Sequence, residues 1–171
     1  MKAHPTYHDL GDHSETIEID YDPAVLNYGD LVTEMLAAHD ATRPHYAMQY
    51  RSAIFWRTEE EREIALAAIA HAAGLLGRIR TAVERLGTFW LAEDYHQKYR
   101  LRGDAEIVRE FRRLCPTERE FVDSTAAARV NGWLSGDGDT MQLERELPLT
   151  GLSERAQARV RAVHASGGRL R

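Results

Sequence analysis

The sequence predicts an α+β fold that is followed by a helical extension. Over about the first hundred residues, strand-like stretches alternate with amphipathic helical patterns in the order β-α-β-α-β. After Arg102-Gly103 the strand-like stretches end, and helix-forming stretches that begin with N-cap residues take their place. We therefore expect a first domain over residues 1–103 and a helical extension over residues 104–171.

Three stretches of the first domain have the composition of strands. Thr16–Tyr21 alternates apolar and acidic residues, which predicts a strand with one buried face that Asp22-Pro23 ends. Gln49–Trp56 carries aromatic and β-branched residues, and Ile79–Leu86 alternates again. We expect these three strands to share one sheet.

The helices of the first domain have recognisable starts. Asp30 is a plausible N-cap for a helix over Leu31–His39, and a loop marked by Pro44 follows. Thr58-Glu59-Glu60-Glu61 combines a capping Thr, a Glu three residues later and acidic residues in the first turn. This second helix should end at the glycines Gly74 and Gly77.

The extension reads as four helices. Cys115-Pro116 ends the first of them, and the loop Gly132–Gly138 follows the third. Capping residues open the second, third and fourth helices. The expected helices cover Ala105–Leu114, a short stretch after Thr117-Glu118-Arg119-Glu120, a stretch from Asp123-Ser124-Thr125 to about Val130, and Leu152–His164 capped by Ser153.

Composition excludes several classes of protein. The chain has 171 residues, a net charge of -5 and a mean hydropathy of -0.49. No stretch approaches the roughly 20 apolar residues that span a bilayer, and the first residues have no apolar run typical of a secretory signal. No large basic face is available for nucleic acid. The single cysteine, Cys115, excludes an internal disulfide and a cysteine-based zinc site, and it favours a reducing, cytoplasmic compartment.

Three features of the sequence could take part in metal binding or catalysis, but each also has an ordinary structural explanation. His4, His8 and His13 could ligate a metal, but a polar loop with ordinary histidines is the favoured reading, so we expect no metal site. Cys115 follows a helix whose carbonyls point toward it, which favours a structural cysteine over a redox role. Glu93–Gln97 is either a surface turn or a buried polar network that supports a site.

A set of short motifs occurs in order across residues 4–99. They are His4-Pro5-Thr6-Tyr7, Gly11-Asp12-His13-Ser14-Glu15, Asp20-Tyr21-Asp22-Pro23, His39-Asp40, Gln49-Tyr50-Arg51-Ser52-Ala53-Ile54-Phe55 and Ala92-Glu93-Asp94-Tyr95-His96-Gln97-Lys98-Tyr99. Together and in this order the motifs resemble those of the type A peptide methionine-sulfoxide reductases. The stretch Val122–Gly132 is similar to a C-terminal extension of one subgroup of that family.

The resemblance implies an enzyme that reduces the S epimer of methionine sulfoxide, free or in proteins. A cysteine attacks the sulfur, thioredoxin-type thiols restore the enzyme, and no other cofactor is implied. Glu15 matches the family's acid, and Tyr7 and Tyr50 match the two tyrosines that hold the sulfoxide oxygen. Asp94, Tyr95 and His96 are expected to support this site. Donors aimed at an oxygen that gains charge stabilise the transition state, and a Glu in an apolar pocket keeps its proton.

Two departures from the family pattern matter. His45 stands where the family often has an aspartate, and the family's Gly-Cys-Phe-Trp segment is absent from the sequence. That segment should precede His4 and carry the nucleophile, the methyl pocket and part of the sheet, so the two-layer domain is expected to be incomplete. This chain alone is then expected to be inactive, with Cys115 no obvious substitute.

Two interpretations remain open. The chain is a reductase by descent, incomplete or completed by another chain, or it is a non-catalytic remnant that binds methionyl or methionine-sulfoxide peptides. Exposed strand edges would favour self-association or a complementing chain. Methionine sulfoxide and thioredoxin are the expected partners, and neither nucleic acid nor a membrane is expected.

Overall fold

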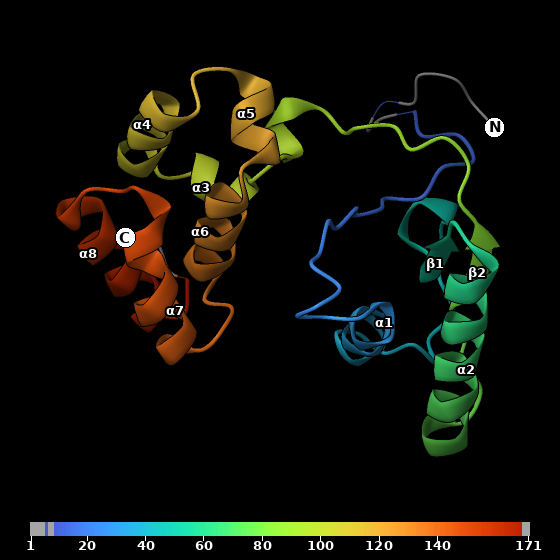
Figure 1. The fold of residues 1–171 in the computed structure, drawn as a ribbon. Coiled ribbons are helices and arrows are strands. Elements are labelled where there is room, and N and C mark those ends of the chain that lie inside the picture. The colour runs from blue at the N-terminus through green and yellow to red at the C-terminus, as the bar shows by residue number, and fades with distance from the viewer. Residues whose placement is uncertain (1–5, 7–8, 169–171) are drawn as a thin grey trace. The chain divides into compact units, whose positions relative to one another are not determined.

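The structure, a computed structural model, describes residue 6 and residues 9–168, and it divides into two compact units, Met1–Leu91 and Ala92–Arg171 (Figure 1). The first unit contains helices and a small parallel sheet, and the elements of the second unit are helices. The α+β prediction is therefore confirmed. Among the residues described, no helix has the combined length and apolarity that crossing a membrane requires.

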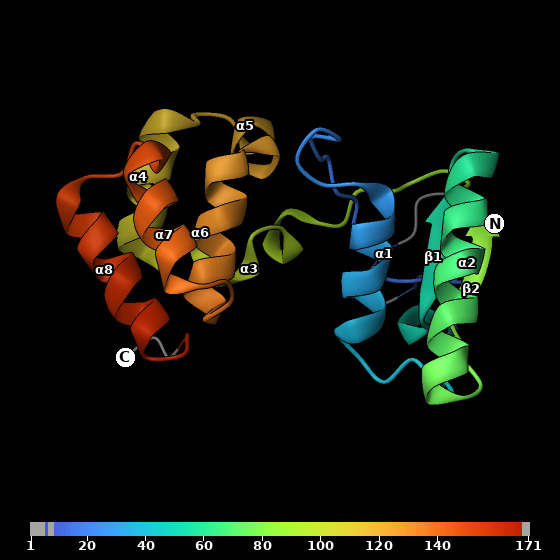
Figure 2. The ribbon, with the colours of Figure 1, turned by 60° about the horizontal axis from the view of Figure 1, so that its bottom comes forward.

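The first unit is built on one β-α-β element. Strand β1 (Ala53–Trp56) and strand β2 (Ala82–Arg85) run parallel, in a register that pairs Ala53 with Ala82 and Trp56 with Arg85. Helix α2 (Glu59–Leu76) connects them and packs against both strands and against helix α1 (Tyr28–Ala37), as Figure 2 shows. A small core of five buried residues joins these elements: Val32, Leu36, Ala41, Ile54 and Ala65.

Local capping explains both helices. The Thr58 hydroxyl accepts from the Glu61 amide at 3.2 Å, and the Glu61 carboxylate accepts from the Thr58 amide, as predicted. Helix α1 begins earlier than predicted, because Asn27 is its N-cap and Asp30 is the reciprocal partner at the third position. The sequence prediction made Asp30 the N-cap, whereas in the structure Asp30 is the third residue of the helix and Asn27 is the N-cap.

The predicted strand over Thr16–Tyr21 is wrong. The stretch lies outside the named helices and strands, and Ile17 and Ile19 are 82% and 50% exposed. A strand needs a neighbour, and in this structure no backbone hydrogen bond joins the stretch to β1. The other two strands are shorter than predicted, and a short 3₁₀ helix, η1 (Met48–Tyr50), precedes β1.

The second unit is a helical bundle with a core of fourteen buried residues among those described. Phe111 and Phe121 pack edge to face in this core, with ring centroids 6.2 Å apart. Its elements are η2 (Asp94–His96), α3 (Tyr99–Arg102), α4 (Ala105–Leu114), α5 (Glu118–Asp123), α6 (Thr125–Ser135), α7 (Thr140–Glu146), η3 (Leu147–Thr150) and α8 (Glu154–Ala165).

The capping residues predicted for α5, α6 and α8 are confirmed: they are Thr117, Ser124 and Ser153. The predicted loop over Gly132–Gly138 begins too early, because α6 continues to Ser135. A glycine inside a helix costs only about 1 kcal/mol, and burial of Trp133 and Leu134 in the same turn outweighs that cost. Helix α7 was not predicted.

The structure groups residues 92–103 with the helical unit, where α3 packs against α4 and α6. The sequence had grouped these residues with the first domain because the family motif continues to Tyr99. The domain boundary at Gly103 stays a prediction.

Replacing Asp104 with Ala should destabilise the helical unit by about 2–3 kcal/mol. Asp104 is 2% exposed, caps α4 through Oδ1 and accepts from Arg159 Nε at 2.5 Å through Oδ2. Asp139→Ala is the matched control, because Asp139 caps α7 at the surface without a buried ion pair and should cost only about 1 kcal/mol. Urea unfolding of the full chain measures both values, and equal costs would contradict the role given to Arg159.

Candidate active site

Glu15 is held against the short helix η1. Its backbone amide donates to the carbonyl of Gln49 at 2.9 Å, and the Gln49 side-chain amide donates to Glu15 Oε1 at 2.7 Å. Two residues 34 positions apart in sequence are thereby joined by backbone and by side chain. Because Tyr50 follows Gln49 directly, this pair of hydrogen bonds brings the predicted acid close in space to one predicted oxygen donor.

Arg51 fixes the segment that carries Glu15. Its Nε donates to the Ser14 hydroxyl at 2.7 Å, and that hydroxyl donates to the Met48 carbonyl at 3.0 Å. The two terminal nitrogens of Arg51 donate to the two carboxylate oxygens of Glu84 on β2, at 2.5 and 2.7 Å. A guanidinium suits this position because its planar fork bonds a carboxylate in bidentate fashion and keeps Nε free for a third partner.

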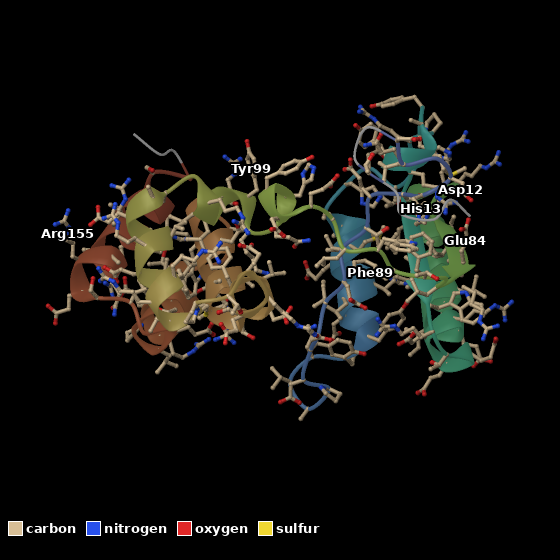
Figure 3. All side chains as sticks on the ribbon, turned by 90° about the horizontal axis from the view of Figure 1, so that it is seen from above. Asp12, His13, Glu84, Phe89, Tyr99 and Arg155 are labelled. Atoms are coloured by element: carbon tan, nitrogen blue, oxygen red, sulfur yellow. The ribbon has the colours of Figure 1, made fainter. Side chains whose placement is uncertain are left out.

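The ion pair between Arg51 and Glu84 favours the ionised form of the Glu84 carboxyl. Hydrogen bonds from the guanidinium hold the pKa of the Glu84 carboxyl below its ordinary value. Glu84 lies on β2, and the chain then continues to Phe89 (Figure 3). Because the Glu84 carboxylate stays ionised near neutral pH, it keeps the Arg51 side chain oriented toward Ser14, the residue before Glu15.

An apolar groove of about 360 Å³ begins beside Glu15. One wall is the extended stretch from Ser14 to Tyr21, and another is β1 with the residue that follows it. Helix α1 supplies further apolar lining through Tyr28, Leu31, Val32 and Met35. Glu15 itself is exposed, so the apolar pocket that an acid needs is not formed around it by the residues described.

Of the two tyrosines predicted to donate to the sulfoxide oxygen, Tyr50 lies among the described residues and Tyr7 does not. Tyr50 ends η1 and is 53% exposed, so its ring is accessible to a ligand. Tyr7 lies outside the described residues, as do His4 and His8 of the histidine cluster. Within the residues described, no group of three His, Cys, Asp or Glu side chains could hold a metal ion.

The predicted supporting residues form the short helix η2 of the second unit. The rings of Tyr95 and His96 lie 4.2 Å apart between centroids, and His96 Nε2 lies 3.9 Å from the carboxylate of Glu93. Asp94 and Tyr95 are exposed, so they do not form the buried network that the sequence suggested. Their support of Glu15 stays a prediction.

Cys115 lies at the C-terminal end of α4 in the helical unit, half-buried and packed against that unit's core. It packs against apolar side chains of that core, at the carbonyl end of α4. Its redox role stays a prediction.

Sequence reasoning gave no role to Arg51, and none to His39. His39 Nδ1 bonds the Met35 carbonyl and Nε2 bonds the Ser52 hydroxyl, both at 2.8 Å, and Ser52 in turn bonds Thr81 at 2.8 Å. This series of hydrogen bonds links α1 to the residues that precede β1 and β2. Both residues belong to the motifs of the sequence, in His39-Asp40 and Arg51-Ser52. The motifs do not indicate which residues distant in sequence His39 and Arg51 contact.

Comparison with known proteins shows the family of this chain. The family described as peptide methionine sulfoxide reductase matches residues 1–128. The chain belongs to this family. A peptide methionine sulfoxide reductase of Drosophila melanogaster is 35% identical over 158 residues, covering 87% of this chain and 61% of that protein. The protein named MsrA from Nitrobacter winogradskyi is 44% identical over 102 residues, covering 55% of this chain and 57% of its own length.

The coverage of these relatives is informative in two ways. The chain spans 61% of the Drosophila protein and 63% of the Methanothermobacter thermautotrophicus protein named MsrA, so neither relative is matched over its full length. An alignment over 87% of this chain reaches well past Leu91, so the Drosophila relative also resembles part of the helical unit. The match to the Nitrobacter winogradskyi protein covers 55% of this chain.

The Arg51–Glu84 pair should make the first unit sensitive to acid. Because the folded-state pKa of Glu84 is lowered, its stabilising effect is present above the ordinary value of 4.5 and is lost as pH falls below it. The effect should be at most about 1 kcal/mol, since the carboxylate is 43% exposed. Glu84→Gln should flatten the loss of stability between pH 6 and 3, measured by amide exchange of β1 and β2.

The Arg51→Met background is the control for this measurement. Glu84→Gln should change nothing there if Arg51 is the cause of the lowered pKa. An equal effect of Glu84→Gln with and without Arg51 would contradict the assignment.

Proposed function

We propose that the chain is the acid-bearing part of a peptide methionine (S)-sulfoxide reductase, in which Glu15 protonates the sulfoxide oxygen and Tyr50 and Tyr7 donate to it. The supporting observation is the double hydrogen bond between Glu15, which lines one end of an apolar groove, and Gln49, the residue before Tyr50. Apolar lining suits a thioether side chain, and a carboxyl with a hydroxyl donor suits a sulfoxide oxygen.

The proposed reaction needs a thiol beside Glu15. A cysteine thiolate attacks the sulfoxide sulfur and forms a bond to it, while Glu15 gives a proton to the sulfoxide oxygen. The resulting hydroxyl group moves from the methionine sulfur to the cysteine sulfur as the bond between the two sulfurs breaks, so the products are methionine and a cysteine sulfenic acid. A dithiol such as thioredoxin then reduces the sulfenic acid to thiol and releases water, while the dithiol becomes a disulfide. The single cysteine of the sequence is Cys115 in the helical unit, so we propose that a segment with the Gly-Cys-Phe-Trp motif supplies the nucleophile.

Covering the groove would also complete the acid. Glu15 is exposed to solvent, whereas a general acid acts best where water is kept away from it. A segment that lies over the groove would remove water from around the Glu15 carboxyl. The one-cysteine composition supports a reducing compartment, the cytoplasm, for this chemistry.

The alternative is a module that binds methionyl or methionine-sulfoxide peptides without turning them over. The apolar groove favours this reading, because it is formed by residues 14–89 and needs no cysteine. Both readings place the ligand's side chain in the same groove, so activity and not binding distinguishes them.

The 171-residue chain by itself should show no thioredoxin-dependent reduction of methionine sulfoxide. Nucleophilic catalysis needs an accessible thiolate beside the acid, and Cys115 is half-buried against the core of the helical unit. Oxidation of thioredoxin with NADPH consumption as the readout measures this directly. Turnover that disappears in Cys115→Ser would overturn the prediction and make Cys115 the nucleophile.

Fusing a family-type segment with Gly-Cys-Phe-Trp ahead of His4 should produce reductase activity and raise the melting temperature. In that fusion Glu15→Gln should lower kcat by about 10²–10⁴-fold, because an amide cannot deliver the proton. Tyr50→Phe should cost less, since a second tyrosine donor remains, and Cys115→Ser should be nearly silent. Single-turnover kinetics with a chiral sulfoxide substrate measures each rate.

The same fusion with its own motif cysteine changed to serine is the control for background reduction. A well-folded but inactive fusion would favour the binding module. An active fusion that is indifferent to Glu15→Gln would show that Glu15 is not the acid.

A further inference from the structure

A second cavity of the first unit, which we call the basic pocket, lies at the end of the sheet where β2 begins. It has a volume of about 450 Å³ and is lined by Pro44, His45, Arg78, Ile79, Arg80 and Thr81. Two of these residues are arginines, one is a histidine and none is acidic. In a chain whose net charge is -5, a pocket with two guanidinium groups and no carboxylate in its lining is suited to an anion.

The two arginines of the basic pocket are available to a ligand. In the described part of the chain, neither the Arg78 nor the Arg80 side chain has an ion pair, a hydrogen bond or a ring contact. The acidic residue of the neighbouring loop, Asp40, pairs with Arg43 at 3.2 Å. On the sheet, the Glu84 carboxylate pairs with Arg51. The positive charge of the basic pocket is therefore not neutralised by either carboxylate.

The backbone that carries the arginines is held in place. Ile79, which separates them, packs against the core of the first unit, and the Arg80 amide donates to the buried Ala41 at its carbonyl, at 2.8 Å. Thr81 is 8% exposed, and its hydroxyl lies 2.8 Å from that of Ser52. A fixed backbone beneath flexible guanidinium groups lowers the entropy that a bound anion must offset.

The basic pocket lies at the same end of the sheet as Tyr50. Strands β1 and β2 are parallel, so the residues before them, Ser52 and Thr81, lie side by side. Tyr50 precedes Ser52 by two residues, which span at most about 7 Å, so the basic pocket lies on the order of 10–15 Å from Tyr50. An extended peptide covers this distance with three or four residues, at roughly 3.3 Å per residue.

We propose that the basic pocket binds the carboxylate of an acidic residue that lies three or four positions from methionine sulfoxide in a peptide. This inference rests on the proposed function in either of its readings, because both place a sulfoxide side chain in the groove that begins beside Glu15. The planar fork of an arginine matches a carboxylate, and two arginines surround it from both sides of Ile79. The chain would thereby prefer oxidised methionines that have an acidic residue nearby in sequence.

Fluorescence anisotropy of labelled peptides with the full chain tests this preference. Each peptide carries one methionine sulfoxide and one aspartate, placed three or four residues before or after it, and the matched peptide has asparagine instead of aspartate. At one of these spacings the aspartate peptide should bind about three- to tenfold more tightly than its match. Roughly 0.5 M NaCl should remove most of this difference, because salt screens exposed charges.

Substitutions in the basic pocket should change the preference between the two peptides. Arg78→Gln and Arg80→Gln should each reduce it at least about twofold, and His45→Asp should reduce it as well, because a carboxylate there would repel the ligand. Arg85→Gln is the matched control. Arg85 is exposed and stacks on Trp56 at the opposite end of β2, so its removal changes the net charge equally and should leave the preference unchanged. Circular dichroism confirms that each variant is folded.

The outcomes separate this inference from the proposed function. Equal affinities for the aspartate and asparagine peptides at every spacing would overturn the inference and leave the proposed function standing. An equal loss of preference in Arg85→Gln would also overturn it, because the preference would then be a general effect of charge.

A third peptide, with alanine in place of methionine sulfoxide, tests the other site. It should bind more weakly than the aspartate peptide while still shifting the Arg78 and Arg80 side-chain signals in NMR spectra. Unchanged affinity for the alanine peptide would support carboxylate binding in the basic pocket and count against the sulfoxide site. Failure of all three peptides to bind would overturn both proposals.

Discussion

The guanidinium of Arg51 is the interaction on which the candidate site depends. It joins the segment before Glu15, the strand β2 and, through Ser14, the backbone of η1. Glu15 follows Ser14 directly, and Gln49 lies two residues before Arg51. The Arg51 side chain therefore holds both members of the Glu15–Gln49 pair in place. Lysine could not replace it, because a single ammonium cannot hold a carboxylate in bidentate fashion and donate sideways to a hydroxyl.

Stability is distributed unevenly between the two units. Among the residues described, the helical unit buries a core of fourteen residues that includes two phenylalanines, whereas the first unit buries a core of five. Burial of apolar area is the main favourable contribution to folding, so we expect the unit that carries Glu15 and Tyr50 to be the less stable one. The Arg51 network and the His39–Ser52–Thr81 chain therefore contribute more to its order than polar contacts usually do.

The sequence predicted well those features that depend on a few neighbouring residues. The capping residues of α2, α5 and α8 follow from three or four neighbouring residues, and the structure has them. The strand over Thr16–Tyr21 failed because alternation predicts a pleated conformation but not a neighbour to pair with. The link of Arg51 to Ser14 and Glu84 spans 37 and 33 residues, and no periodicity of a single sequence indicates contacts at that separation.

The proposed reaction needs a change at one surface, the groove beside Glu15. Glu15 is exposed in this structure, whereas a general acid acts best where water is kept away from it. The Ser52 and Trp56 carbonyls accept from the Ala82 and Leu86 amides, so the alternate residues Ala53 and Phe55 turn their backbone groups away from β2 and toward the groove that they line. A cysteine-bearing segment over this groove would therefore shield Glu15 and bring the thiol that the reaction needs to the same place.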